Sequence, residues 1–444
     1  MIDSARIRLL DETLREGDSR GYHRHPPERR LKLLREIHEV TGIEHFSLGF
    51  AVVNDSDRET LQAFLEARRQ GTLPKALVAH VYGWYQIDER AHQLLESIPA
   101  ADRAAVAFHF ACSASEVMAR PTDGPWLLAR TGAATALADL ATPQLHQGLQ
   151  EAFGALIRRY GGYRLHSVGA IVQDAFRCSE EELDGYVAAA EAAGCTEVRL
   201  HDTVGTATPL GVAERMDHLH GRFGRLRFGV HFHDDLGMAV ANTVTALARG
   251  AAGADVTVNG IGNRAGNASA AAVLMALQVV HGVTLPRVAY ARLSELALSV
   301  ERHYVMLQSP HAPVTGRLLH LDEATIRTHL MRTASPLTFL PYDPAQVGGH
   351  IGAALGPGSG RRAIELAVER AGESLRRAGL TPDASLVDRA WAWAQGECAR
   401  RAEAERPRAL AAMEQYQAIL RGSYVTDDDV LAMALASKGS FART

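Results

Sequence analysis

Two histidines separated by one residue, His231 and His233, form the pattern in this sequence with the clearest chemical meaning. They end an apolar run, and residues two apart in a strand point to the same face, so both imidazoles can reach one point. Neutral imidazoles are common metal ligands, and the carboxylates of Asp234 and Asp235 follow directly. A helical pattern begins just afterwards, which places the pair at a strand end. The pattern favours a metal site over its alternative, a structural histidine pair inside a barrel.

A second cluster of charge lies near the N-terminus, where an apolar run ends and Arg15, Glu16 and Gly17 follow. Gly17 allows the backbone to turn after the charged pair. An arginine beside a glutamate is most often a solvated ion pair. Here the pair also offers a carboxylate ligand for a metal and a fixed cation for a developing oxyanion. Because the two clusters are far apart in the sequence, only a closed barrel would bring both strand ends to one mouth.

Strand-like and helix-like runs alternate through roughly the first two thirds of the chain. Eight apolar runs have the length of strands, at 7–10, 45–50, 76–82, 105–111, 164–171, 196–200, 226–232 and 255–259. Amphipathic helical stretches lie between most of them, for example at 28–40, 57–69, 180–193, 209–222, 238–249 and 268–279. The segment 113–144 contains several prolines, and we expect an elongated active-site loop or short helices there. The alternation predicts an α/β fold, a (β/α)8 TIM barrel.

The chain of 444 residues is longer than one ordinary domain, so we expect an appendage after the barrel. We place the TIM-barrel domain at 1–285, a linker subdomain at 286–360 and a mostly helical C-terminal domain at 361–444. Helical patterns in the last part cover 362–378, 384–404, 408–419 and 427–436. Their arginine-rich face is expected to be solvated, as in an oligomerisation cap.

Charge and cysteine content exclude several classes of protein. The chain has 47 basic and 51 acidic residues, a balance that argues against nucleic acid or an anionic membrane as a partner. Its four cysteines form no Cys-x-x-Cys pair, which suggests reduced thiols. We see no signal peptide and no apolar run of membrane length. These features predict a cytoplasmic protein.

Four motifs, in this order, resemble those of a family of metal-dependent TIM-barrel enzymes that condense or cleave acyl-CoA substrates, the DRE-TIM metallolyases. The family includes homocitrate, isopropylmalate and citramalate synthases and 3-hydroxy-3-methylglutaryl-CoA lyase. The motifs are Asp11-x-Thr13-Leu14-Arg15-Glu16-Gly17, Asp202-Thr203-Val204-Gly205, His231-x-His233-x-Asp235-x-Gly237 and Asn259-Gly260-x-Gly262-x-Arg264-x-Gly266-Asn267. Beyond the barrel the resemblance is weaker, at 344–348 and 358–361. It implies a member close to a homocitrate or isopropylmalate synthase.

The resemblance also implies a role for each matching residue. The divalent-metal ligands would be Glu16, His231, His233 and Asn267, and the metal could be Mn, Zn, Mg, Co or Fe. Arg15 would hold the developing oxyanion. Substrate would contact His109, Thr203 and Arg177, and His329 would be a catalytic histidine supplied to the partner's site in a homodimer, or else a surface histidine. The co-substrates implied are an acyl-CoA, such as acetyl-CoA, and a small 2-oxo acid.

The sequence departs from the synthases along one wall of the expected site. Ser47 stands where they carry a strand-two glutamate, and Ile171 and Gln173 replace a strand-five serine and glutamate. We keep Gln173 as a catalytic position, although a neutral amide cannot take a proton. Either another group is the base, or Asp174 has taken over, or the reaction differs. The changes favour a specialised substrate.

Three functions remain open from the sequence. The first is a Claisen-type condensation of an acyl-CoA with a 2-oxo acid, giving a 2-hydroxy dicarboxylic acid. The second is a lyase or aldolase reaction at a related carbon–carbon bond, which the loss of the glutamate at position 173 makes more plausible. The third is a non-catalytic metal-binding paralogue, and the intact Arg15, Glu16, His231 and His233 argue against it.

Overall fold

The computed structural model describes residues 2–18, 25–132, 136–322, 325–353 and 360–422, together with 427, 429–431 and 433. The chain divides into two compact units. The first comprises Met1–Gln308 with Pro313–Thr315, and the second comprises Ser309–Ala312 with Gly316–Thr444. The three-part division at 285 and 360 stays a prediction.

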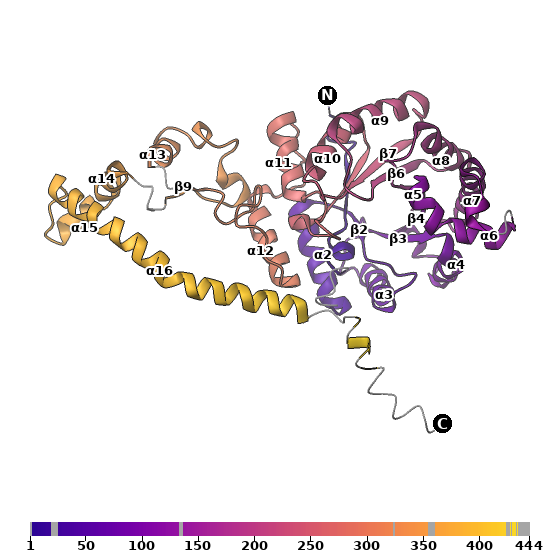
Figure 1. The fold of residues 1–444 in the computed structure, drawn as a ribbon, viewed down its shortest axis with the longest axis horizontal. Coiled ribbons are helices and arrows are strands. Elements are labelled where there is room, and N and C mark those ends of the chain that lie inside the picture. The colour runs from indigo at the N-terminus through magenta and orange to yellow at the C-terminus, as the bar shows by residue number, and fades with distance from the viewer. Residues whose placement is uncertain are drawn as a thin grey trace, which may run out of the picture. The chain divides into compact units, whose positions relative to one another are not determined.

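Eight parallel strands of the first unit form a closed barrel in the order β1 to β8 (Figure 1). β1 pairs with both β2 and β8, which closes the sheet. The strands are β1 (Arg8–Asp11), β2 (His45–Ser47), β3 (Val78–Trp84), β4 (Val106–Ser113), β5 (Ser167–Gln173), β6 (Glu197–Asp202), β7 (Arg227–Phe232) and β8 (Gly253–Val256). The predicted TIM barrel is therefore confirmed, and each predicted strand overlaps an observed one.

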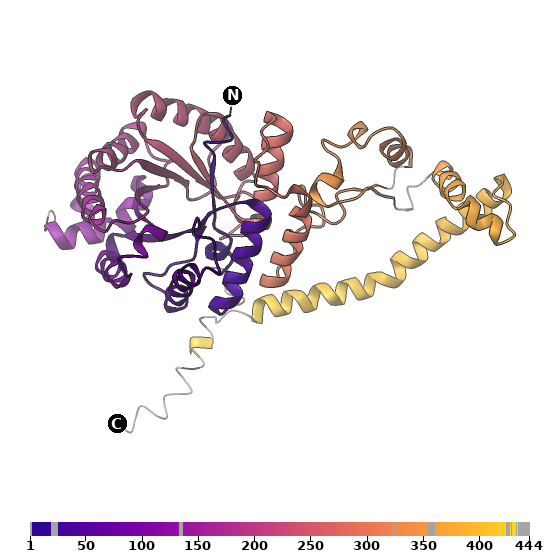
Figure 2. The same cartoon turned by 180° about the vertical axis from the view of Figure 1, so that it is seen from behind.

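Helices surround the strands, as both views show (Figures 1 and 2). They are α1 (Thr13–Asp18), α2 (Pro27–Thr41), α3 (Asp55–Arg69), α4 (Asp88–Ser97), α5 (Glu116–Thr122), α6 (Gly124–Thr131), α7 (Thr142–Gly161), α8 (Glu180–Ala192), α9 (Pro209–Arg222), α10 (Ala239–Ala248), α11 (Ala270–His281) and α12 (Leu293–Tyr304). Local signals set their ends: a capping box of Ser179 and Glu182 starts α8. The proline-rich segment after β4 forms the short helices α5 and α6.

The interior of the barrel is polar, whereas branched apolar residues usually fill this position. His80, His109, Arg199, His201 and Asp255 are each at most 6 % exposed. Arg199 pairs with Asp255, and His80 bridges two other imidazoles: its Nε2 lies 2.9 Å from His45 Nδ1 and its Nδ1 lies 2.9 Å from His109 Nε2. Mutual pairing offsets part of the cost of burying these groups, although His109 Nδ1, His201 Nε2 and Arg199 Nε have no hydrogen-bond partner among the described residues.

The apolar core lies outside this polar interior, between strands and helices. The rings of Phe108 and Tyr160 are 4.3 Å apart, and Phe110 and Phe153 pack beside them. All four side chains are fully buried. The hydrophobic free energy of this layer holds the helices on the barrel, which leaves the interior free to carry ionisable groups.

The second unit is mostly helical, as predicted. It contains β9 (Leu321–Asp322) paired with β10 (Gly352–Ala353), and the helices α13 (Thr325–Thr333), α14 (Arg361–Arg370), α15 (Gly372–Arg377) and α16 (Ala384–Gly422). A small core of Ile364, Val368, Val387 and Ala394 joins α14 to α16. Residues 358 and 359 of the weaker resemblance at 358–361, and half of the predicted helix 427–436, lie outside the described residues.

Two predictions about this unit are wrong. The segment 362–378, expected as one helix, is divided at Ala371 into α14 and α15. The segments 384–404 and 408–419, expected as separate helices, form the single 39-residue helix α16 with Pro407 inside it. Proline removes one helical hydrogen bond and clashes with the preceding turn, and this can either bend or end a helix. Where the flanking residues are exposed and favour helix, as they do here, the helix continues past the proline. Of the helices among the described residues, none is long and apolar enough to cross a membrane.

Candidate active site

The two charged clusters of the sequence meet at the carboxyl ends of the barrel strands. Glu16 lies in α1, directly after β1, while His231 is the last residue but one of β7 and His233 directly follows the strand. One ligand atom from each of the three residues lies within 4.8 Å of the others, and all three side chains are buried. Asn267 comes from the loop after β8, and its backbone forms an isolated antiparallel β-bridge with that of His233. The fold therefore brings all four predicted ligands together.

The geometry and chemistry of this cluster fit a divalent cation. The Nε2 atoms of His231 and His233 face each other at 3.3 Å, and Asn267 Nδ2 lies 3.1 Å from His231 Nε2. Asn267 Oδ1 is buried without a hydrogen-bond partner among the described residues. A Cβ at Gly262 would collide with this oxygen and lie 3.2 Å from Glu16 Oε2, so the glycine keeps the space open. Mixed nitrogen and oxygen donors of this kind suit several divalent metals.

Burial keeps His233 in the form that a metal needs. It lowers the pKa of His233 to about 3, with the nearby charges of His231 and Arg264 adding to the effect. The ring is therefore neutral at physiological pH and can offer a lone pair. Its Nδ1 lies 3.3 Å from the carbonyl oxygen of Gly266, which favours the tautomer with the proton on Nδ1.

The outer face of His231 is held by carboxylates. His231 Nδ1 lies 3.1 Å from both Glu12 Oε2 and Asp255 Oδ2. The ring stacks on His201 with centroids 4.4 Å apart. Carboxylates at Nδ1 fix the proton there and turn Nε2 toward the cluster, an arrangement that orients metal-binding histidines in general.

Arg15 is a rigid cation beside the cluster. Its guanidinium lies 2.6 Å from Glu12 Oε1 and 3.3 Å from Glu16 Oε1. The rings of Phe50 and Tyr82 lie on it at 5.1 and 5.0 Å. Burial alone would lower the pKa of Arg15, but the two carboxylates outweigh it and raise the pKa, so the charge is permanent. An oriented cation of this kind can stabilise an oxyanion on a ligand of the metal.

The wall formed by the ends of β5 and β6 carries the other predicted residues. Gln173 ends β5, and the backbone N–H of Asp174 donates to the Thr203 hydroxyl at 2.8 Å. The carboxylate of Asp174 accepts hydrogen bonds from Arg177, at 2.7 and 2.8 Å, and from Ser115. Asp174 is thus engaged as a structural anchor, which makes it a poor substitute for the missing base at position 173.

The other two predicted residues are His109, which lies deeper in the barrel, and His329, which belongs to the second unit. His109 is inside the barrel, where its Nε2 is taken by His80 and its other face meets Gly169. Its connection to the mouth runs through Tyr82, with the two rings stacked at 6.0 Å. His329 is half-buried in α13 of the second unit. The roles assigned to both remain predictions.

Sequence reasoning assigned no role to Glu12, Tyr82, Asp255, Arg199 or Arg264, although Arg264 stands in one of the four motifs. Arg264 pairs with Asp235 at 2.9 Å and donates to the backbone oxygen of Thr203, which ties two strand-end loops together. Asp255 lies within an otherwise apolar buried strand, and a charge in such a run was the available signal for it. Glu12 gave no signal, because it occupies a variable position of its motif.

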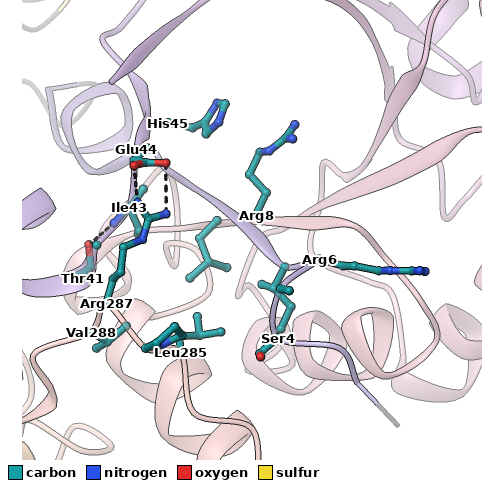
Figure 3. A pocket seen from close by; sticks show the side chains of 15 residues that line it. Ser4, Arg6, Arg8, Thr41, Ile43, Glu44, His45, Leu285, Arg287 and Val288 are labelled. Carbon is teal, nitrogen blue, oxygen red and sulfur yellow. Dashed lines mark hydrogen bonds and ion pairs between the residues drawn. The ribbon is translucent and has the colours of Figure 1, made fainter. Parts of the chain in front are cut away.

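A separate cavity of about 310 Å³ opens at the opposite end of the barrel, at the amino ends of β1 and β2 (Figure 3). It is lined by several cations, but each has a carboxylate partner. Arg8 pairs with Glu197 at 3.2 Å. Arg287 binds Glu44 through the contacts that the dashed lines between these two residues mark in Figure 3. We call this end the floor of the barrel. Its pairs are stabilising, and nothing there converges on a ligand.

Comparison with known proteins identifies relatives of this chain. Homocitrate synthase AksA of Methanocaldococcus jannaschii is 36 % identical over 192 residues, which cover 43 % of this chain and 47 % of the relative. Homocitrate synthase AksA of Methanopyrus kandleri is 27 % identical over 375 residues, 82 % of each chain. A solved HMG-CoA lyase from Acinetobacter baumannii shares the fold with a TM-score of 0.51 at 16 % identity, covering 72 % of this chain and 96 % of that one.

The family model described as HMGL-like matches residues 6–300, which include the whole barrel and every residue of the candidate mouth. This match, over about two thirds of the chain, shows that the chain is a member of the HMGL-like family.

Proposed function

We propose that this protein is a divalent-metal-dependent acyltransferase. It condenses an acyl-CoA, such as acetyl-CoA, with a 2-oxo acid, and water hydrolyses the thioester to give a 2-hydroxy dicarboxylic acid and free CoA. The observation that carries the proposal is the convergence of Glu16, His231 and His233 beside the buried cation Arg15. The names of relatives that align with most of the chain support it, since they are homocitrate, isopropylmalate and citramalate synthases.

The mechanism assigns a task to each group at the mouth. A bound divalent cation would polarise the carbonyl of the oxo acid as a Lewis acid. Arg15 stabilises the negative charge that grows on the oxygen as the new bond forms, and its pairing with Glu12 and stacking on Tyr82 keep it in place for that step. Thr203, at the rim of the same mouth, offers a hydroxyl to the substrate carboxylate.

The wall of the site supports a specialised substrate. Ser47 and Gln173 put neutral groups where the synthases carry carboxylates, so neither can take a proton from the acyl donor. The same observation favours a second candidate, a lyase acting on a related carbon–carbon bond. Arg177 is proposed to contact substrate from this wall.

The assembly and location are also proposals. We infer a homodimer in the cytoplasm, in which His329 of one subunit serves the mouth of the other. The resemblance to the synthases and the absence of a membrane-length helix among the described residues support this.

Thiol release provides the direct test. The purified protein is incubated with acetyl-CoA and a panel of 2-oxo acids in the presence of Mn²⁺, Mg²⁺ or Zn²⁺, and free CoA is measured with Ellman's reagent. We expect release that requires one 2-oxo acid and one of the metals, with His231→Ala as the inactive control. Cleavage of a 3-hydroxyacyl-CoA without any condensation would instead establish the lyase.

A further inference from the structure

Glu12 contacts both Arg15, the proposed oxyanion donor, and His231, a candidate metal ligand. It lies between β1 and α1, and its side chain is 1 % exposed. One carboxylate oxygen, Oε1, accepts hydrogen bonds from Arg15 at 2.6 Å and from the Tyr82 hydroxyl at 2.8 Å. The other, Oε2, lies 3.1 Å from His231 Nδ1. A single carboxylate thus contacts both the oxyanion cation and a candidate metal ligand.

A buried carboxylate is costly unless it is fully paired. Glu12 is paired on one side with the guanidinium of Arg15 and the Tyr82 hydroxyl, and on the other side it faces the ring of His231. Arg15 can therefore use this carboxylate as an anchor.

Two other carboxylates, those of Asp255 and Glu16, also contact His231 or Arg15, but each has a further interaction. Asp255 also reaches His231 Nδ1, but it is held from the far side by Arg199. Glu16 also reaches Arg15, but it is a candidate metal ligand, and coordination would draw its charge toward the metal. Once Glu16 is committed in this way, Glu12 is, among the described residues, the carboxylate in contact with Arg15 that can keep it oriented.

We propose that Glu12 is a positioning residue that fixes the Arg15 guanidinium relative to the His231 imidazole. The guanidinium of Arg15 and a metal held by His231 would then both contact the same bound oxo acid. The catalytic part of this inference rests on the proposed function, whereas the part that concerns His231 needs only metal binding.

The first experiment measures metal affinity without any substrate, by competition with a chromogenic chelator. Glu12→Gln keeps the size of the side chain and removes its charge, so we expect Mn²⁺ or Zn²⁺ to bind tenfold or more weakly, in the range typical of lost outer-sphere partners. Glu301→Gln is the matched control, because Glu301 is another buried glutamate, 4 % exposed and in α12. Wild-type affinity in Glu12→Gln would overturn the proposal.

The second experiment tests the coupling to Arg15 by a double-mutant cycle. In the wild-type background, Glu12→Gln should lower kcat at least tenfold at saturating metal. In the Arg15→Ala background the same change should lower kcat less than threefold, because no guanidinium is left to position. An equal loss in both backgrounds would overturn the proposal, since a general structural defect would act in either.

Thermal unfolding checks that each variant folds. If Glu12→Gln does not fold, Glu12→Asp replaces it, since it keeps the charge and draws the carboxylate back by one methylene. Smaller losses in the same two measurements are then expected, and wild-type values would overturn the proposal. Weakened metal binding in a protein that shows no condensation with any 2-oxo acid would leave the His231 contact standing and refute the proposed function.

Discussion

The two ends of the barrel contain the same kinds of residues and use them differently. At the floor, Arg8 and Arg287 each meet a carboxylate of their own, Glu197 and Glu44. At the mouth, Arg15 shares Glu12 and Glu16, and two imidazole nitrogens face each other at 3.3 Å. Groups that neutralise one another contribute stability, whereas groups that converge with unused lone pairs are arranged for a ligand. The cavity at the floor is therefore a poorer guide to function than the polar cluster at the mouth.

The largest expected effect is the loss of metal from His231→Ala. Removing one of two facing imidazoles leaves too few donors, so we expect the bound divalent metal to fall from about one equivalent to near zero. The matched variant is His45→Ala, which removes a half-buried histidine at the floor and should retain the metal. Metal analysis of both proteins decides the matter, and equal stoichiometry would refute the assignment.

Arg15→Ala should leave metal content unchanged and lower kcat by about a hundredfold or more, because it removes an oriented donor to the oxyanion. Steady-state kinetics provides the measurement. A rise in KM alone, with kcat preserved, would mean that Arg15 only binds substrate.

Gln173→Glu tests whether the wall of the mouth takes part in the reaction. A new carboxylate near a metal-bound acid adds repulsion, and its own pKa would respond to the cation. We expect the native reaction to slow by about tenfold, as judged from kcat/KM on the native substrate. Unchanged kinetics would place position 173 outside the chemistry, and faster condensation would show that the position lacks only a base.

The smallest effect is expected at the floor. Arg287→Ala breaks an exposed pair with Glu44, in which the arginine side chain is 62 % exposed. Pairs of this kind contribute about 1 kcal/mol or less, so we expect a small fall in Tm and turnover within twofold of wild type. A large loss of turnover would contradict the division between a structural floor and a catalytic mouth.

Much of the fold could be predicted because its signals are local. Alternating strand and helix periods, with turn residues between them, indicate a barrel from the sequence alone. Pro407 misled the prediction for the same reason, since a local helix-breaking rule was applied to a segment that continues as α16. The structural cost of one proline is set by what surrounds it, and the local rule does not include that.

The candidate site divides in the same way. The sequence by itself determined the residue types of the mouth, because His231-x-His233 and Arg15-Glu16 carry their chemistry in their spacing. Only the tertiary structure decided which groups are paired. It brought Ser115 to Asp174, placed His109 against His80 and brought Glu12 to His231. Pairing depends on distances between strands that are remote in sequence, and closure of the barrel sets those distances.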